Sequence, residues 1–417
     1  MDDGLPSTSG LLRYPKMYNS FLFLGLLAYL TKSGAHVLQN IQQDTKASCE
    51  LTASLGDDAP QFLAAAASCE TVTIPAGTTL NIETRLDMTG MSNLNIDLQG
   101  TIRFSPNIDY WSENGFPITF QDQITFWLLG GENIVLSGGG TLDGAGQAWY
   151  DAFASNSSLL RPIILTLNQA TNAFVENIQM INSPEWFNLV NECQNVTFNN
   201  ITITARSTSD NFISNTDGWD IYRSDSVTIE NSVINNGDDC VSFKPNSTNI
   251  LVSNLDCTGS HGISVGSLGQ FSGVFDIVQN VTAINIQMSD AENGARIKAF
   301  AGDNVGSGMV QNITFQNFVV SDVDNPVVID QCYETSADDC EEFPSNVFIQ
   351  DIFFNNISGT GSGSQVASLD CSPDGRCSDI TVSGFDLSGP DGKTTYECQN
   401  VDLSGNAASL FGTCTTT

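Results

Sequence analysis

Four short polar motifs between residues 215 and 298 combine side chains that acid–base chemistry needs. They are Asn-Thr-Asp-Gly (215–218), Gly-Asp-Asp-Cys (237–240), Ser-His-Gly (260–262) and Arg-Ile-Lys (296–298). Carboxylates and an imidazole can hold and transfer protons, and a pair of cations can bind an anionic group. Crowded carboxylates cannot all ionise, so one of them keeps a proton and can act as an acid beside an ionised neighbour. Each motif alone is also typical of a turn or an exposed strand, so their arrangement in the fold is decisive.

The sequence around these motifs repeats one pattern, in which a polar residue precedes a few β-forming residues, then one or two polar residues, then further β-formers. The repeat recurs after 23 residues from Asn172 to Asn195, and again from Ser226 to Asn249. Short strands rich in Val, Ile, Thr and Phe, with Asn and Gly at the bends, are typical of a solenoid. The sequence therefore predicts an all-β fold, a right-handed parallel β-helix. A β-sandwich is the weaker alternative, because it predicts regular hairpin turns and does not predict a repeated sequence pattern.

The motif spacing matches the length of one coil of such a helix. Asp217 and Asp238 are 21 residues apart. Asp239 and His261 are 22 residues apart. Stacked strands lie about 4.8 Å apart, so we expect these side chains to form one cluster. Adjacent residues of a strand point to opposite faces, so both Asp238 and Asp239 can reach the cluster only if the chain bends, which Gly237 permits.

The basic motif is expected on the same surface. Arg296 follows His261 after 35 residues, and Arg296 and Lys298 share a face because alternate residues of a strand point the same way. The whole chain has only 14 Lys and Arg residues, so two of them beside the acidic cluster are informative. Arg offers a planar fork and Lys a compact charge, and both suit a carboxylate ligand.

The four motifs resemble the signatures of the polygalacturonases, family 28 of the glycoside hydrolases, in their order, their spacing and their residues. The resemblance covers roughly residues 60 to 400, with further matches at 138–146 and 182–186. Other segments look more like the fungal exopolygalacturonases than the endo-acting enzymes: 218–219, 241–249 and 331–333. The resemblance implies hydrolysis of the α-1,4 bonds between galacturonic acid units of polygalacturonan in pectin, starting from the non-reducing end.

The resemblance also assigns roles to the acidic cluster. Asp238 would be the general acid, and Asp217 and Asp239 would hold the water that attacks the anomeric carbon with inversion. His261 would adjust the acid through a hydrogen bond rather than transfer the proton itself. Direct displacement of this kind typically uses carboxyl groups about 6.5 to 9.5 Å apart.

The remaining site residues would select the substrate. Arg296 and Lys298 would bind the C6 carboxylate of galacturonate, and Tyr333 matches a substrate-contacting tyrosine of the family. No cofactor and no metal are expected, because the chain has two His residues and lacks the paired Cys-x-x-Cys of a zinc site. Five tryptophans could line a sugar cleft, although most such residues pack in a core: Trp111, Trp127, Trp149, Trp186 and Trp219.

Alternative functions stay open at this stage. An endopolygalacturonase or a rhamnogalacturonan or xylogalacturonan hydrolase would share the motifs and differ in its loops. A β-helix pectate lyase would use calcium held by Asp residues and would release unsaturated products. A non-catalytic carbohydrate-binding β-helix would bind without forming reducing sugar.

The charge of the chain limits its partners. Fourteen basic residues against 47 acidic residues give a formal net charge of −33, which argues against nucleic acid and anionic membranes. The expected substrate is itself a polyanion. Local cations at 296 and 298, together with an acidic working pH that neutralises surface carboxylates, are expected to overcome the repulsion. We expect a monomer.

The N-terminus is typical of a secreted protein. Residues 1–35 are expected to be an N-terminal extension and signal peptide, because an apolar run at 21–30 follows Lys16 and precedes small residues at 33–35. The run is too short to span a bilayer comfortably. Residues 36–417 are expected to form one catalytic β-helix domain. Seven Asn-x-Ser/Thr sequons are compatible with glycosylation of an extracellular protein.

Eleven cysteines in such a chain predict disulfides with one cysteine left over. Short loops favour five pairs: Cys49 with Cys69, Cys240 with Cys257, Cys332 with Cys340, Cys371 with Cys377, and Cys398 with Cys414. Cys193 would then be unpaired and buried. The pair of Cys240 with Cys257 would brace the coil that carries Asp238.

Overall fold

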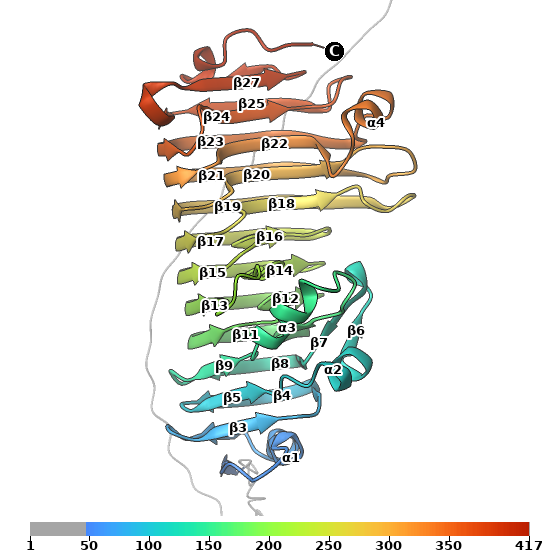
Figure 1. The fold of residues 1–417 in the computed structure, drawn as a ribbon, viewed down its shortest axis with the longest axis vertical. Helices are drawn as coiled ribbons and strands as arrows, with labels where there is room; N and C mark the ends of the chain where they lie inside the picture. The colour runs from blue at the N-terminus through green and yellow to red at the C-terminus, as the bar shows by residue number, and fades with distance from the viewer. Residues whose placement is uncertain (1–46, 417) are drawn as a thin grey trace, which may run out of the picture. The chain divides into compact units, whose positions relative to one another are not determined.

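The computed structural model describes residues 47–416, and they form one right-handed parallel β-helix (Figure 1). The predicted fold class is therefore confirmed. The predicted signal peptide, 1–35, and the first residues of the predicted domain, 36–46, lie outside the described residues. Within the described part of the chain, no helix is long and apolar enough to cross a membrane.

One face of the coil is a stack of short parallel strands, and this stack carries the polar motifs. Its strands follow one another along the helix axis: β12 (Asn188–Asn191), β14 (Trp219–Tyr222), β16 (Val241–Phe243), β18 (Ile263–Leu268), β20 (Asn293–Phe300), β22 (Asn325–Tyr333), β24 (Gln365–Asp370) and β27 (Thr395–Gln399).

Long strands complete the central coils, and most of them turn a corner part of the way along. They stack in the same order as the short strands: β11 (Leu165–Ile181), β13 (Gln194–Thr204), β15 (Asp225–Asn235), β17 (Ser247–Thr258), β19 (Phe275–Ser289), β21 (Ser307–Val323) and β23 (Val347–Gly361).

Shorter elements form the terminal coils. At the N-terminal end they are β1 (Ser48–Glu50), α1 (Ala59–Ser68), β2 (Thr71–Ile74), β3 (Thr79–Ile82), β4 (Leu86–Leu98), β5 (Thr101–Phe104), β8 (Trp127–Ser137) and β9 (Thr141–Asp143). At the C-terminal end they are β25 (Cys377–Ser383), β26 (Asp386–Ser388), η2 (Pro390–Gly392), β28 (Leu403–Ser404) and η3 (Ala408–Leu410). Helix α1 packs its apolar side against the first coils, which closes that end of the core (Figure 1).

Insertions project from the coils beside the short-strand stack (Figure 1). A small second sheet joins β6 (Phe116–Ile118), β7 (Gln123–Thr125) and β10 (Pro162–Ile163). Its β6–β7 pair is antiparallel, whereas the other strand pairs within residues 47–416 are parallel. Four further short elements belong to these insertions: α2 (Ile108–Asn114), η1 (Phe120–Asp122), α3 (Gln147–Phe153) and α4 (Ala337–Glu342).

The repeated polar residue of the sequence pattern is explained by the corners of the coil. Asn231, Asn254, Asn285, Asn317 and Asn356 all adopt a left-handed backbone conformation, with φ between 53° and 59°, which Asn tolerates better than most residues. Their side chains form a ladder in which each amide nitrogen donates to the amide oxygen one coil below, at 2.9 to 3.1 Å. The ladder keeps the coils in register.

Apolar side chains stack in the same way inside the coil. One buried row takes one residue from each successive strand: Val196, Val227, Ile250, Val281, Ile313, Ile352 and Ile380. These β-branched residues suit a pleated, close-packed surface, and their burial is the main force that holds the coils together.

All eleven cysteines lie in the described residues, and the five predicted disulfides are present: Cys49–Cys69, Cys240–Cys257, Cys332–Cys340, Cys371–Cys377 and Cys398–Cys414. Cys193 is unpaired and buried, as predicted.

Candidate active site

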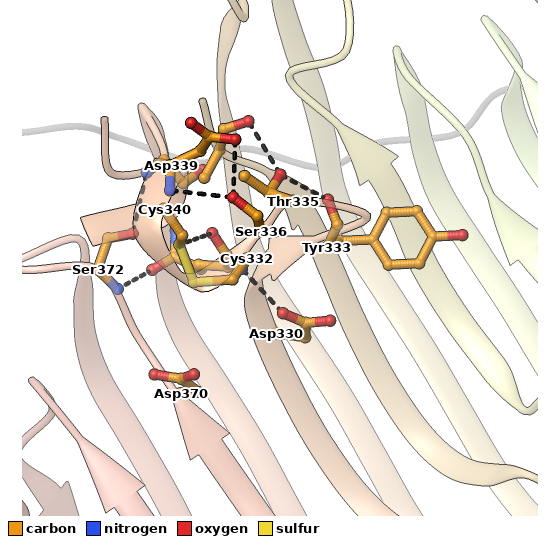
Figure 2. Close-up of a disulfide and its surroundings, with 12 residues drawn as sticks. Asp330, Cys332, Tyr333, Thr335, Ser336, Asp339, Cys340, Asp370 and Ser372 are labelled. Atoms are coloured by element: carbon orange, nitrogen blue, oxygen red, sulfur yellow. Dashed lines mark hydrogen bonds between the residues drawn. A yellow bond between two sulfur atoms is a disulfide. The ribbon is translucent and has the colours of Figure 1, made fainter. Parts of the chain in front are cut away.

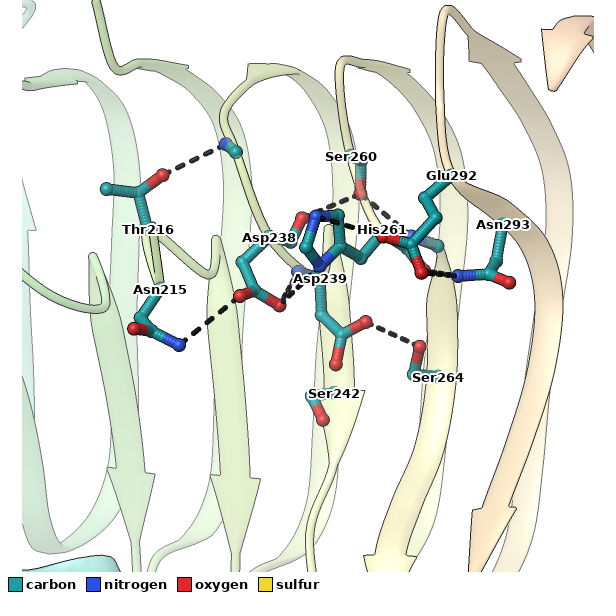
Figure 3. A network of polar contacts seen from close by, with 12 residues as sticks. Asn215, Thr216, Asp238, Asp239, Ser242, Ser260, His261, Ser264, Glu292 and Asn293 are labelled. Atoms are coloured by element: carbon teal, nitrogen blue, oxygen red, sulfur yellow. Dashed lines mark hydrogen bonds and ion pairs between the residues drawn. The ribbon is translucent and has the colours of Figure 1, made fainter. Parts of the chain in front are cut away.

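The acidic motifs lie at one corner of three successive coils. Asp217 precedes β14, Asp238 and Asp239 lie between β15 and β16, and His261 lies between β17 and β18. Because β14, β16 and β18 pair in parallel register, these segments lie side by side on successive coils (Figure 3). The predicted cluster of carboxylates and imidazole is therefore present in the fold.

The bend that presents both aspartates is also present. A Cβ added to Gly237 would lie 2.5 Å from Ile213 Cγ1 and 2.8 Å from the Ile213 carbonyl oxygen, so this position is restricted to glycine by close approach. The Asn236 amide then donates to the carbonyl oxygens of Asp238 and Asp239, at 2.9 and 3.0 Å, and fixes the turn. The Cys240–Cys257 disulfide anchors the next residue to the coil above.

Asp239 is held as a carboxylate by basic neighbours. Its side chain is fully buried, and the Lys298 Nζ lies 2.8 Å from Asp239 Oδ2. The Ser264 hydroxyl donates to Oδ1 at 2.6 Å. Burial by itself would raise the pKa of Asp239, but the charges of Lys298, Arg296 and Lys244 outweigh burial and hold that pKa below its usual range. Asp239 therefore stays ionised in acid.

Asp217 has the opposite character. It is 3% exposed, and burial together with the neighbouring charges of Asp220 and Asp238 raises its pKa well above the usual range, with Lys244 opposing the shift. Asp220 is buried beside it, and burial raises the Asp220 pKa to about 7 although the Lys244 Nζ lies 3.0 Å from its Oδ1. The cluster thus retains a proton at a pH where Asp239 is ionised.

Asp238 faces the cleft between two sets of donors. The Asp239 N–H donates to Asp238 Oδ1 at 2.8 Å, and His261 Nδ1 lies 3.2 Å from the same oxygen. The Asn215 amide donates to Oδ2 at 3.4 Å. His261 Nε2 lies 3.4 Å from Glu292 Oε2 (Figure 3). Burial alone would lower the pKa of His261, but the contact with Asp238 and the charge of Glu292 raise it above its usual value. His261 can therefore donate to both carboxylates.

The three aspartates offer carboxylate oxygens that lie within 4.8 Å of one another. This separation is shorter than the range expected for direct displacement, because consecutive coils stack at about that distance and the carboxylates come from stacked corners. A single water can accept this spacing, since two hydrogen bonds of about 2.8 Å span it. Such a group of carboxylates could also hold a metal ion, but the Lys298 ammonium already neutralises Asp239 from within the protein.

The predicted basic residues border the same cluster. Arg296 and Lys298 lie on β20, and Tyr333 ends β22, the next strand of the stack. The Tyr333 ring centroid is 5.3 Å from Arg296 Cζ and 5.2 Å from Lys298 Nζ, so the ring packs against both cations. Lys298 donates one hydrogen bond to Asp239, and its ammonium group has two further N–H donors.

The local fold around Tyr333 is braced (Figure 2). The Cys332–Cys340 disulfide ties the strand end to α4. The Cys332 N–H donates to Asp330 Oδ1 at 2.8 Å. The Thr335 hydroxyl contacts the carbonyl oxygens of Ala301 and Tyr333, each at 3.0 Å. The tyrosine ring is thereby directed away from the disulfide and toward the cations.

A cleft of about 370 Å³ opens over Asp217, Asp238, Lys298 and Tyr333, a size suited to a small ligand or a chain end. One side of it is lined by the insertions of earlier coils, with contributions from η1, β7 and residues 157–161. Gln121 Nε2 in η1 lies 3.2 Å from Gln270 Oε1, which follows β18, so an insertion and a later loop meet beside the cleft.

Several residues that line the cleft lie outside the four sequence motifs and were not predicted as site residues. Arg161, Glu185 and Lys244 are buried, charged and directed to the cleft. The only local signal was a charged residue within or beside an apolar strand, as in Val-Ser-Phe-Lys (241–244). Among the tryptophans, Trp186 lines the cleft, with Lys244 Nζ 5.5 Å from its ring, while the other four are fully buried.

Comparison with known proteins identifies the family of the chain. The sequence model of the glycosyl hydrolases family 28 matches residues 65–410, and the chain belongs to this family.

Several similar proteins are fungal. The chain is 46% identical over 363 residues to an exopolygalacturonase of Cochliobolus carbonum, covering 83% of this chain and 81% of that protein. It is 44% identical over 365 residues to a probable exopolygalacturonase X of Aspergillus fumigatus, covering 84% of each. Among solved structures, the endo-xylogalacturonan hydrolase of Aspergillus tubingensis matches with a TM-score of 0.81 and 36% identity, covering 89% of this chain and 99% of that one.

Proposed function

We propose that this protein is an exo-acting glycoside hydrolase that releases galacturonic acid units from polygalacturonan. The proposal is carried by one observation: in a chain similar to fungal exopolygalacturonases, a cleft lined by Asp217, Asp238, Lys298 and Tyr333 opens beside the buried carboxylate of Asp239. Insertions that line one side of the cleft favour binding of a chain end over passage of a continuous polymer.

In the proposed reaction, Asp238 gives its proton to the oxygen that links two sugars. A water held between Asp217 and Asp239 attacks the anomeric carbon from the opposite side, and its proton passes to one of these carboxylates. The bond from the anomeric carbon to the linking oxygen breaks as the new carbon–oxygen bond forms. His261 holds Asp238 in place and adjusts its acidity. One shorter chain and one galacturonic acid result.

Substrate selection is proposed to come from charge. Arg296 and Lys298 would bind the C6 carboxylate of a galacturonate, and Tyr333 would pack against the sugar ring. Lys298 can do so while bound to Asp239, because its ammonium group has three donors.

The anomeric configuration of the first product tests the mechanism directly. Because the carboxylate oxygens are closer together than is usual for inversion, the inverting mechanism rests on the family resemblance. Proton NMR of the first products from a trigalacturonate should show the β-anomer before mutarotation. An α-anomer at the earliest time point would indicate double displacement instead.

The function itself is tested by a product time course from a defined galacturonate oligomer, with and without chelator. Monomer at the earliest times, unaffected by chelator, is expected. Mixed oligomers would indicate endo action, and unsaturated products a lyase. An Asp238→Asn variant that binds the oligomer without cleaving it is expected, whereas wild-type binding without any product would leave only a carbohydrate-binding role.

Xylogalacturonan is the second candidate substrate, because the Aspergillus tubingensis structure matches this chain over nearly its full length. Parallel assays on polygalacturonan and xylogalacturonan separate the two. Higher kcat/KM on polygalacturonan is expected.

The protein is further proposed to be a secreted, glycosylated monomer, with a signal peptide at 1–35 and one catalytic domain at 36–417. Support comes from the disulfides, which fit an oxidising, extracellular environment. N-terminal sequencing and size-exclusion chromatography of protein from culture medium test the signal cleavage and the oligomeric state.

A further inference from the structure

A buried arginine lies beneath the first acidic motif. Arg161 directly precedes β10, and its side chain is 2% exposed. Its Nη1 donates to the carbonyl oxygens of Pro184, at 2.9 Å, and Ser214, at 2.7 Å. Its Nη2 donates to Asn215 Oδ1 at 2.8 Å and lies 2.8 Å from Glu185 Oε2. Each of the four Nη hydrogens therefore has an acceptor.

This arrangement determines which way the Asn215 amide faces. A guanidinium group can only donate hydrogen bonds, so Asn215 must turn its oxygen toward Arg161. The amide nitrogen is then directed to the opposite side, where it donates to Asp238 Oδ2 at 3.4 Å. The Phe153 ring, whose centroid is 3.7 Å from Arg161 Cζ, holds the guanidinium plane in place.

We propose that Arg161 is a positioning residue for the reaction, which acts by fixing the amide of Asn215 and so holding a donor against Asp238. Asp238 Oδ1 is already held by the Asp239 N–H and His261, so the Asn215 amide completes the orientation of the carboxyl group from its other oxygen. This inference rests on the proposed function, in which Asp238 is the acid.

The contacts from Arg161 through Asn215 to Asp238 form a relay, and this relay affects how activity depends on pH. A donor aimed at a carboxyl oxygen favours the ionised form, whereas an amide oxygen aimed at it favours the protonated form. The other titratable groups around the Asp238 carboxyl are Asp217, Asp220, Asp239, Arg161 with Glu185, and His261 with Glu292 behind it, and they are unchanged when Asn215 flips. If the amide is lost or free to flip, a donor that favours the ionised form is removed from Oδ2. Activity then persists further into the alkaline range, although the turnover number falls because the carboxyl group is less well oriented.

Two variants test the relay through different residues. Asn215→Ala removes the amide, and Arg161→Lys keeps the charge but cannot satisfy the same four acceptors. In each, kcat on a galacturonate oligomer should fall about tenfold with KM changed by less than about twofold. The alkaline limb of the pH profile should move up by about half a pH unit. The double variant should resemble Asn215→Ala alone, because both changes act through one amide.

Glu185→Gln is the matched control. It touches Arg161 but not Asn215, and burial raises the pKa of Glu185, so glutamine resembles its acid form. Its alkaline limb should match that of the wild type. If these residues only supported the fold, all three single variants would lose thermal stability, and the alkaline limb of each pH profile would stay at the wild-type position.

An alkaline limb at the wild-type position in folded Asn215→Ala would overturn the inference, even if Arg161→Lys fails to fold. Additive effects in the double variant would also overturn it. Asp238→Asn separates this failure from failure of the proposed function. If Asp238→Asn remains active, the role of Asp238 as acid is wrong. If it is inactive and the limbs do not move, only the role of Arg161 is wrong.

Discussion

Replacing Lys298 by Met should destabilise the fold strongly near neutral pH and much less in acid. Lys298 and Asp239 form an ion pair of 2.8 Å, with side chains that are 6% and 0% exposed. Removing one partner of a buried pair typically costs about 3 to 5 kcal/mol, because the other charge stays buried without compensation. Arg296 and Lys244 also act on Asp239, so the lower end, about 3 kcal/mol, is expected.

The pH dependence follows from the sign of the pKa shift. In the wild type the pKa of Asp239 is depressed, so its contribution to stability is present above the unfolded value of about 3.9 and is lost only below it. In the variant burial prevails and the pKa of Asp239 is raised. The penalty is then present at neutral pH and disappears as the pH falls through that raised value.

Denaturant unfolding at pH 7, 5.5 and 4 measures this directly. The free-energy difference between wild type and Lys298→Met should shrink as the pH falls. The exposed Lys393→Met is the matched control and should change stability little at any pH. The double variant Lys298→Met with Asp239→Asn should recover most of the loss at pH 7. An equal loss at all three pH values would refute the electrostatic reasoning and indicate lost packing.

Three further predictions concern the acid, the imidazole and the disulfide. Asp238→Asn should lower kcat by about 100-fold or more with KM and thermal stability nearly unchanged; an unfolded variant would show a structural role instead. The raised pKa of His261 contributes stability that is complete below about pH 6.5 and is lost as the pH rises through its folded value, so His261→Gln should flatten this part of a stability–pH curve. Opening Cys240–Cys257 with Cys257→Ser should cost about 2 to 4 kcal/mol and reduce kcat, whereas Cys377→Ser should reduce stability with kcat retained.

Much of the fold was predictable because a β-helix is built from local, repeated units. The 23-residue step from Asn172 to Asn195 places both residues at the same corner, and their amides do bond to each other at 2.7 Å. The disulfides were predictable for a related reason, since each joins cysteines no more than 20 residues apart.

Part of the site was predictable from the same spacing. Asp217, Asp238 and His261 recur at coil length and therefore had to stack at one corner. Which carboxylate stays ionised was not predictable, because Asp239 is distinguished from Asp217 by partners such as Lys298, which lies 59 residues away in the chain. The distances between carboxylates likewise follow from the stacking of the corners rather than from the motifs.

The sequence by itself determined the coil, its corners and the surface on which the polar motifs gather, because strand propensity and repeat length act locally. Only the tertiary structure decided the ionisation of that surface and the outline of its cleft. Arg161 reaches Asn215, and Gln121 reaches Gln270, across 54 and 149 residues. Such contacts depend on how insertions fold back over distant coils, and burial there sets the charge of each group through desolvation that no local pattern records.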